Sequence, residues 1–291
     1  MKIRLVAVVG ALLVVAFPNS GLAAEKCFGK PVTIQGTKGR NTIVGTGGAD
    51  VIHGGGSSDV IYGGGGDDRI CGGNGFDTLY GGAGADRIDG GDNQDLIDGG
   101  PGDDVLRAEG REGFFVSGYS QRPGGEAVSY ENAPGPVTVD MVSGTATGYG
   151  NDRLVGFSEI IGSDYSDTLI GGPTWNGFLI NGRGGDDVIY GHDGDSDSGD
   201  FLAGGPGDDE IYGLNGFDLL RGNRGDDLLD GGPDGEFDMG DTAYYLDFYA
   251  GRWGSGFYPG AKGPISADLT TGVATGEGTD TLRNIEYVRQ P

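Results

Sequence analysis

The sequence is dominated by a nine-residue repeat. Eight units follow one another without a gap from residue 36 to residue 107, GTKGRNTIV, GTGGADVIH, GGGSSDVIY, GGGGDDRIC, GGNGFDTLY, GGAGADRID, GGDNQDLID and GGPGDDVLR. Every unit has glycine at its first position and Ile or Leu at its eighth, and every unit after the first has aspartate at its sixth. Such a strict period indicates a structural repeat whose copies stack and bury one continuous core.

Glycine makes up 65 of the 291 residues, about three times its ordinary share. Because glycine loses the most conformational freedom on folding, this content argues against a helical bundle or a compact α/β enzyme. Within the nine-residue phase, however, glycine suits turns with positive φ, and the single aliphatic residue near the end of each unit suits a short strand that faces inward. We therefore expect an all-β fold.

The charge excludes several partners. The chain has 44 acidic and 19 basic side chains, a formal net charge of -25. Binding to nucleic acid needs clustered Lys and Arg, and so does adsorption to anionic membranes. We expect neither partner. A chain with this much charge and little hydrophobicity tends to be disordered, so folding here calls for something cationic that neutralises the acid.

The pattern GGxGxDxUx, with U a large aliphatic residue, resembles the RTX, or hemolysin-type, calcium-binding nonapeptide. The similarity is to secreted bacterial calcium-binding repeat proteins and to the β-roll domain of serralysin-like proteases. It implies a parallel β-roll, in which the first six residues of a unit form a turn, the last three form a strand, and two units make one coil. It also implies that each Ca²⁺ lies between the turns of every second unit, where carboxylates and carbonyls supply the hard oxygen ligands that calcium prefers.

The metal ligands implied by this resemblance are the aspartates at position six. In the first array Asn41 replaces the first of them and is expected to weaken its site, and the remaining pairs predict five ions. The repeat resumes over 162–239 with two insertions, where Asn176 takes position six of an irregular unit and we expect roughly three to five ions. The alternative is that these aspartates are solvated turn residues that bind no metal. That alternative explains why aspartate occurs in a turn but not why it recurs every nine residues. The candidate ligands are Asp50, Asp59, Asp68, Asp77, Asp86, Asp95, Asp104, Asp167, Asp187, Asp200, Asp209, Asp218 and Asp227.

Two segments lack the nonapeptide, 108–161 and 240–291. The first alternates apolar and polar residues at Val137, Val139 and Met141. That alternation is typical of half-buried strands.

The two segments also align with each other, so that Asp140 matches Asp268 and Asp152 matches Asp280. We therefore predict a tandem duplication in which each parallel β-roll array is followed by a β-rich module. The modules are expected to cap the rolls, and ligand binding is the alternative.

The N-terminus predicts export. Residues 1–24 combine basic residues, an apolar run from Leu5 to Phe17 and a small-residue end, as in a cleavable secretory signal peptide. No later apolar run approaches the roughly 20 residues of a membrane span. In an oxidising compartment the only two cysteines, Cys27 and Cys71, are expected to form a disulfide. Free or intermolecular thiols are the alternative.

These predictions divide the chain into a signal peptide (1–24), a cap with the first roll (25–107), a β-rich module (108–161), the second roll (162–239) and a C-terminal β-rich module (240–291). The expected function is a secreted, extracellular, non-catalytic calcium-binding protein that folds on binding several Ca²⁺ ions. One alternative is an adhesion or matrix protein whose modules bind a glycan or protein. Another is an enzyme with a site in a module, although neither module contains histidine or cysteine.

Overall fold

A computed structural model describes residues 26–108, 126–172, 177–192, 199–233, 240–245, 248–249, 257–258, 265–276 and 278–289. The expected signal peptide lies outside the described residues. All regular elements in the described ranges are β-strands, so the predicted all-β class is confirmed. No helix in these ranges is long and apolar enough to cross a membrane. The chain forms two compact units, one of Met1–Ser117 with Gly150–Gly156 and the other of Gly118–Tyr149 with Phe157–Pro291.

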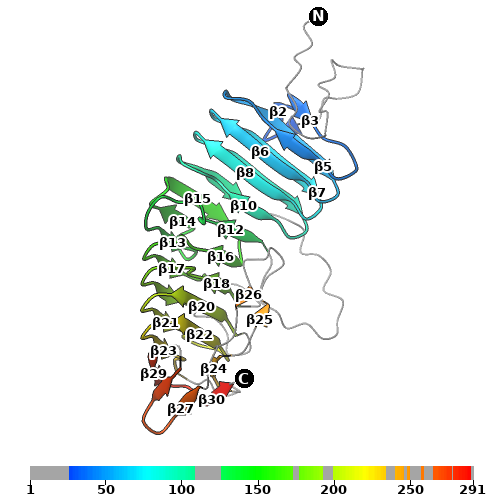
Figure 1. The fold of residues 1–291 in the computed structure, drawn as a ribbon. Coiled ribbons are helices and arrows are strands. Elements are labelled where there is room, and N and C mark those ends of the chain that lie inside the picture. Colours follow the sequence, from blue (N-terminus) through cyan, green and yellow to red (C-terminus); the bar gives the residue numbers. More distant parts are fainter. Residues whose placement is uncertain are drawn as a thin grey trace, which may run out of the picture. The chain divides into compact units, whose positions relative to one another are not determined.

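The first unit is a parallel β-roll, in which consecutive repeats alternate between two sheets (Figure 1). Strands of one sheet pair in parallel with the strand two repeats further on, for example Ile52 with Ile70 and Ile61 with Leu79. One sheet consists of β4 (Thr42–Val44), β6 (Val60–Gly65), β8 (Thr78–Ala83) and β10 (Leu96–Asp98). The other consists of β3 (Ile34–Gln35), β5 (Val51–Gly56), β7 (Arg69–Asn74), β9 (Arg87–Asp92), β11 (Val105–Arg107) and β15 (Asn151–Val155).

The core of this roll is the column of position-eight side chains. Each strand turns this residue inward, and because one such residue recurs per unit, the two sheets bury a single layer of aliphatic groups between them. Burying each one contributes about 1.5–3 kcal/mol. The fully buried members are Ile43, Ile52, Ile61, Ile70, Leu79, Ile88, Ile97 and Leu106.

A short hairpin precedes the first roll. Its strands are antiparallel, and its two turn residues, Phe28 and Gly29, both have positive φ, 46° and 74°. That combination matches a tight type I′ turn. The predicted disulfide is confirmed, because Cys27 and Cys71 are bonded with their Cα atoms 5.8 Å apart. The bond ties the hairpin to β7. The hairpin strands are β1 (Lys26–Cys27) and β2 (Lys30–Pro31).

The second unit is also a parallel β-roll, with spacings that lengthen where the turns carry insertions. Val188 pairs with Glu210 across an enlarged repeat, whereas Phe201 pairs with Leu219 at the regular spacing. One sheet consists of β12 (Ala127–Ser129), β16 (Glu159–Ile161), β18 (Leu179–Asn181), β20 (Phe201–Pro206), β22 (Leu219–Arg224), β24 (Thr242–Tyr244) and β30 (Tyr287–Arg289). The other contains β13 (Thr138–Asp140), β17 (Thr168–Ile170), β19 (Val188–Tyr190), β21 (Glu210–Tyr212), β23 (Leu228–Asp230) and β29 (Thr279–Arg283).

Antiparallel pieces complete the second unit. They extend the sheet at β13 and at β29, and a further pair stands apart as a two-stranded sheet. The strands concerned are β14 (Thr145–Thr147), β25 (Phe248–Tyr249), β26 (Phe257–Tyr258), β27 (Ser266–Asp268) and β28 (Val273–Thr275).

The segments without the nonapeptide send strands back into the rolls. In the first unit β15 pairs in parallel with the last repeat strand, placing Leu154 beside Leu106. In the second unit β29 does the same, placing Leu282 beside Leu229. Each roll therefore continues for one more rung after its nonapeptides end.

Candidate metal centre

Aspartates at position six form hydrogen-bonded ladders along the turns of the first unit. In each rung one carboxylate oxygen, Oδ1, accepts a hydrogen bond from the backbone N–H of the position-six residue one coil earlier. The donor–acceptor distances are 2.6–2.8 Å, and the partners are 18 residues apart. The pairs are Asn41 to Asp59, Asp50 to Asp68, Asp59 to Asp77, Asp68 to Asp86, Asp77 to Asp95 and Asp86 to Asp104.

The second carboxylate oxygen, Oδ2, is buried without a hydrogen-bond partner in many rungs. These aspartates are at most 2% exposed, and an unpaired buried polar atom costs about 1–3 kcal/mol, more when it is charged. A column of such oxygens is stable only if something else neutralises them, and a cation is the partner that fits. The atoms are Oδ2 of Asp59, Asp68, Asp77, Asp86, Asp104, Asp187, Asp209 and Asp227.

Backbone carbonyls lie beside these oxygens because glycine leaves room for them. A Cβ built on Gly72, at position one, would lie 2.4 Å from the carbonyl oxygen of Gly90 and 2.5 Å from Oδ2 of Asp77. Both oxygens therefore crowd the same side of that glycine. At position four a Cβ on Gly84 would lie 2.5 Å from the carbonyl oxygen of Gly66. The turns thus stack carbonyl and carboxylate oxygens closely, which is a donor set suited to Ca²⁺.

Burial raises the pKa of the ladder carboxyls, and neighbouring carboxylates add to the effect at several rungs. In the first unit burial raises the pKa of Asp59, Asp68, Asp77 and Asp86 to about 6. It raises the pKa of Asp200 and Asp209 to about 7, and that of Asp104, Asp187 and Asp227 to about 8. The charged form is therefore held at a cost in the absence of metal, and a bound divalent cation would remove that cost.

Sequence comparison agrees with the geometry. The family model described as "RTX calcium-binding nonapeptide repeat (4 copies)" matches residues 35–70, 72–106, 179–196 and 197–234. The chain contains RTX calcium-binding nonapeptide repeats. Its cofactor is Ca²⁺, which RTX nonapeptides bind between their turns.

One solved structure similar to this chain is that of extracellular lipase LipA from Serratia marcescens. The alignment has a TM-score of 0.28 and 16% sequence identity, and it covers 85% of this chain and 38% of that chain. This chain therefore spans well under half the length of that protein. No curated protein sequence matches the chain.

The thirteen predicted aspartates are not equivalent. In the eight named above, Oδ2 has no hydrogen-bond partner in the protein. In a smaller class, Asp50, Asp167 and Asp200, Oδ2 already accepts a hydrogen bond from the protein. Thr46 donates to Asp50 from both its N–H and its Oγ1, each at 2.7 Å. The N–H of Ser163 donates to Asp167 at 2.6 Å, and the N–H of His192 donates to Asp200.

Position two of the unit separates the two classes. Where Oδ2 lacks a partner, position two has positive φ, as at Gly64 (106°), Arg183 (80°) and Asn223 (81°). The residues with positive φ in the described part of the chain do not include Thr46, Ser163 or His192. With ordinary φ the position-two amide points at the carboxylate, and the turn satisfies itself. The signal in the sequence is a Thr, Ser or His at position two, and the nonapeptide pattern alone overlooks it.

Other ladder positions differ from the sequence prediction. Asn176, expected at position six of the irregular unit, lies outside the described residues. The ladder place is taken by Phe178, whose N–H donates to Oδ1 of Asp200 at 2.6 Å. Three residues that no nonapeptide predicts also accept ladder bonds through Oδ1. They are Asp152, Asp241 and Asp280, which accept from Asp104, Asp218 and Asp227.

The donor set differs from that of side-chain metal sites. Across the described ranges no cluster of three or more His, Cys, Asp and Glu residues is placed to hold a metal.

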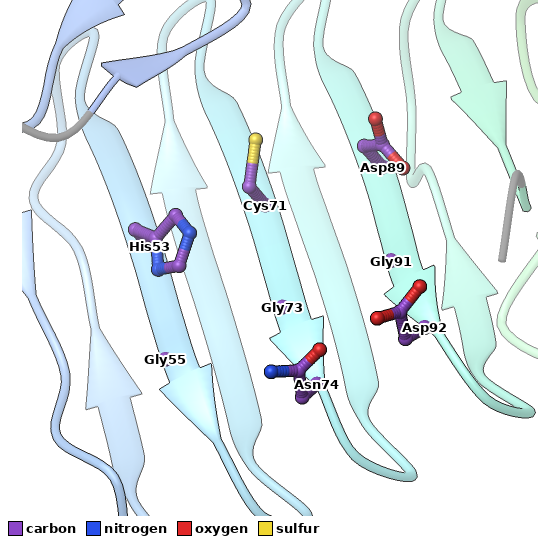
Figure 2. A pocket seen from close by; sticks show the side chains of 8 residues that line it. All are labelled: His53, Gly55, Cys71, Gly73, Asn74, Asp89, Gly91 and Asp92. Carbon is purple, nitrogen blue, oxygen red and sulfur yellow. The ribbon is translucent and has the colours of Figure 1, made fainter. Parts of the chain in front are cut away.

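A shallow open hollow of about 390 Å³ lies on the first unit, on the face that carries the position-nine side chains of β5, β7 and β9. Figure 2 shows His53, Cys71 and Asp89 on these three adjacent strands, with Asn74 and Asp92 nearer the strand ends. Cys71 is held in the disulfide, so its sulfur is not a free thiol. The hollow is separate from the ladder aspartates.

Proposed function

We propose that this protein is secreted and non-catalytic, and that its two rolls fold when Ca²⁺ binds between stacked turns. The observation that carries the proposal is the column of buried Oδ2 atoms without hydrogen-bond partners, several of which lie beside a glycine carbonyl. The position-six aspartates are the proposed ligands, and neighbouring rungs on one side share each ion.

In the first unit five rung pairs would hold ions. The pair that includes Asp50 is expected to be the weakest of them, because Thr46 already satisfies one oxygen of that carboxylate. The pairs are Asp50 with Asp68, Asp68 with Asp86, Asp86 with Asp104, Asp59 with Asp77, and Asp77 with Asp95. In the second unit the corresponding pairs are Asp167 with Asp187, Asp187 with Asp209, Asp209 with Asp227, and Asp200 with Asp218.

Calcium binding would be coupled to folding because the metal-free fold must bury charged aspartates, which costs free energy. Without metal each rung buries an uncompensated carboxylate near others of like charge, and binding to the folded state alone stabilises it by RT ln(1 + [L]/Kd) per independent site. At 100 times Kd this is about 2.7 kcal/mol for each ion. The five sites proposed for the first unit together are therefore comparable to the whole stability of a typical domain, about 5–15 kcal/mol.

The test uses the full chain without its signal peptide, stripped of metal. Far-ultraviolet circular dichroism is followed as Ca²⁺ is added, with Mg²⁺ at equal concentration as the control and metal analysis of the refolded protein. We expect β-structure to appear near millimolar Ca²⁺ and not with Mg²⁺, because Mg²⁺ demands a stricter octahedral site. Identical spectra in EDTA and in Ca²⁺ would sink the proposal.

Secretion has independent support. The Cys27–Cys71 disulfide is of the kind that persists in oxidising compartments, and residues 1–24 have the pattern of a signal peptide. Expression of the full sequence in a Gram-negative host, followed by N-terminal sequencing of exported protein, should find cleavage after Ala24. Retention of the whole chain in the cytoplasm with residues 1–24 attached would contradict secretion.

A further inference from the structure

The rungs that follow the last nonapeptide of each roll share a pattern. Residues 147–155 read TGYGNDRLV and residues 275–283 read TGEGTDTLR. Both have glycine at positions two and four, aspartate at position six and leucine at position eight, with threonine in place of the first glycine. Their strands, β15 and β29, pair in parallel with the last nonapeptide strand of their own roll.

The position-four glycines of these rungs make the same close approach as those inside the arrays. A Cβ on Gly150 would lie 1.6 Å from the carbonyl oxygen of Gly102, and a Cβ on Gly278 would lie 1.6 Å from that of Gly225. Within the arrays, a Cβ on Gly102 would lie 1.8 Å from the carbonyl oxygen of Gly84. The returning chain therefore stacks onto the preceding turn as a nonapeptide does.

At position five of the turn, the returning rungs also make the same hydrogen bond as the rungs inside the array. Asn151 donates its N–H to Oδ1 of Asp103 at 2.9 Å, and Thr279 donates its N–H to Oδ1 of Asp226 at 2.8 Å. Inside the second array Asp226 donates to Asp208 in the same way at 2.9 Å. Position five of each returning rung is thus in register with the turns before it.

The aspartates at position six continue the ladder. Oδ1 of Asp152 accepts the N–H of Asp104 at 3.0 Å, and Oδ1 of Asp280 accepts the N–H of Asp227 at 3.4 Å. Both side chains are buried, with exposures of 4% and 3%. These partners are 48 and 53 residues apart in sequence, yet the bond is the one that joins regular rungs.

An orphaned oxygen stands at the same place in both rolls. Oδ2 of Asp104 and Oδ2 of Asp227 are buried without a hydrogen-bond partner, and the two residues are 1% and 2% exposed. These two rungs are the last nonapeptides of their columns. Asp86 and Asp209, one coil earlier, each belong to two proposed ion pairs, whereas Asp104 and Asp227 belong to only one each unless a further ion lies between them and the returning rung.

We propose that Asp152 and Asp280 are calcium ligands that complete one further ion site in each roll, shared with Asp104 and Asp227. The inference rests on the proposed function and extends it past the family match, which ends at residues 106 and 234. In the second unit Tyr245 donates its hydroxyl to Oδ2 of Asp280 at 2.5 Å. As with Thr46 and Asp50, a protein donor already satisfies this oxygen, so we expect the site at Asp280 to bind Ca²⁺ more weakly than the site at Asp152.

The test counts calcium ions bound to the full chain without its signal peptide, by native mass spectrometry and by metal analysis. The variants are Asp152→Asn and Asp280→Asn, in which the amide oxygen still accepts the ladder hydrogen bond while the charge is lost. We expect each variant to bind one ion fewer than the wild type. The controls are Asp140→Asn and Asp268→Asn, which remove the same charge at matched positions of the two duplicated segments but outside the ladder.

The outcomes separate the two proposals. If the wild type binds no calcium, the proposed function itself fails. If the wild type binds calcium and both ladder variants bind the same number of ions as it does, this inference fails alone. Should a variant not fold in calcium, a crystal structure of the wild type grown in Ca²⁺ or Tb³⁺ decides. Ion density between Asp104 and residues 150–152 supports the inference, and its absence there overturns it.

Discussion

At the scale of the residue, the two oxygens of one carboxylate have different roles. At Asp86, for example, Oδ1 joins the rung to its neighbour, whereas Oδ2 has no hydrogen-bond partner in the protein and is the proposed calcium ligand. A substitution that keeps the acceptor and removes the charge therefore separates the structural role from the binding role.

Asp86→Asn should weaken calcium binding with little change to the ladder. Asp86 lies between two proposed ions, so the calcium midpoint of folding should rise at least tenfold, about 1.4 kcal/mol. Asp92→Asn, at the far end of β9, the strand that follows Asp86, and outside the ladder, is the control. The measurement is a calcium titration followed by circular dichroism, and equal midpoints for both variants would contradict the ligand role of Asp86.

Gly84→Ala should destabilise the calcium-loaded protein. Gly84 has φ of 137° and its Cβ would collide with the Gly66 carbonyl, so the expected loss is about 1–3 kcal/mol or more. Gly47→Ala is the control, because no heavy atom lies within 4 Å of its Cβ. Urea unfolding in saturating Ca²⁺ compares the two, and the stacked-turn geometry would be wrong if Gly84→Ala were as stable as Gly47→Ala.

At the scale of the element, the sequence predicts the strands of the repeats but not the strands and ladder positions that lie outside the regular repeat. The period of nine predicts the buried position-eight residues, because one aliphatic residue recurs per unit, and the resemblance to the RTX nonapeptide implies the parallel register with two units per coil. The hairpin of β1 and β2 and the return of β15 and β29 depend on contacts between residues far apart in sequence, which no local pattern encodes. The place of Phe178 in the ladder follows from an insertion whose path a repeat cannot specify. The domain boundaries and the identity of the metal ligands stay predictions.

The disulfide should stabilise the first unit measurably. It closes a loop with a sequence separation of 44, for which the chain-entropy estimate is about 4 kcal/mol. The double variant Cys27→Ser, Cys71→Ser should therefore unfold at lower urea concentration in saturating Ca²⁺. Reduction of the wild type should reproduce the loss, and it should leave the double variant unchanged. An unchanged midpoint in the double variant would mean that the disulfide adds nothing to stability.

At the scale of the whole molecule, calcium should reverse the dependence of stability on pH. The pKa of the ladder carboxyls rises from an ordinary 3.8 to about 6 to 8 in the fold. Protonated ladders are thus favoured by folding, and this contribution is fully present below pH 4 and is lost progressively as the pH rises from about 4 through 6 to 8. In Ca²⁺, protons compete with the metal, so affinity should rise over the same interval.

The measurement is the β-structure content and urea midpoint at pH 5 and pH 8, at constant salt, with and without Ca²⁺. Chelator-treated buffer replaces EDTA at pH 5, where EDTA binds calcium weakly. Metal-free protein should be the more stable at pH 5 and calcium-loaded protein at pH 8. Greater stability of the metal-free protein at pH 8 would show that the ladder carboxyls do not titrate as their burial implies.

The returning rungs have a consequence for how such a chain can change. A contact across 48 residues, as between Asp104 and Asp152, costs only about 0.9 kcal/mol more in loop-closure entropy than one across 18 residues, as between Asp86 and Asp104. A roll can therefore accept a long insertion between two rungs at small thermodynamic cost, provided that the chain returns with glycine and aspartate in phase. The junctions after residues 107 and 230 are places of this kind, where new sequence can be spliced in while the stack continues.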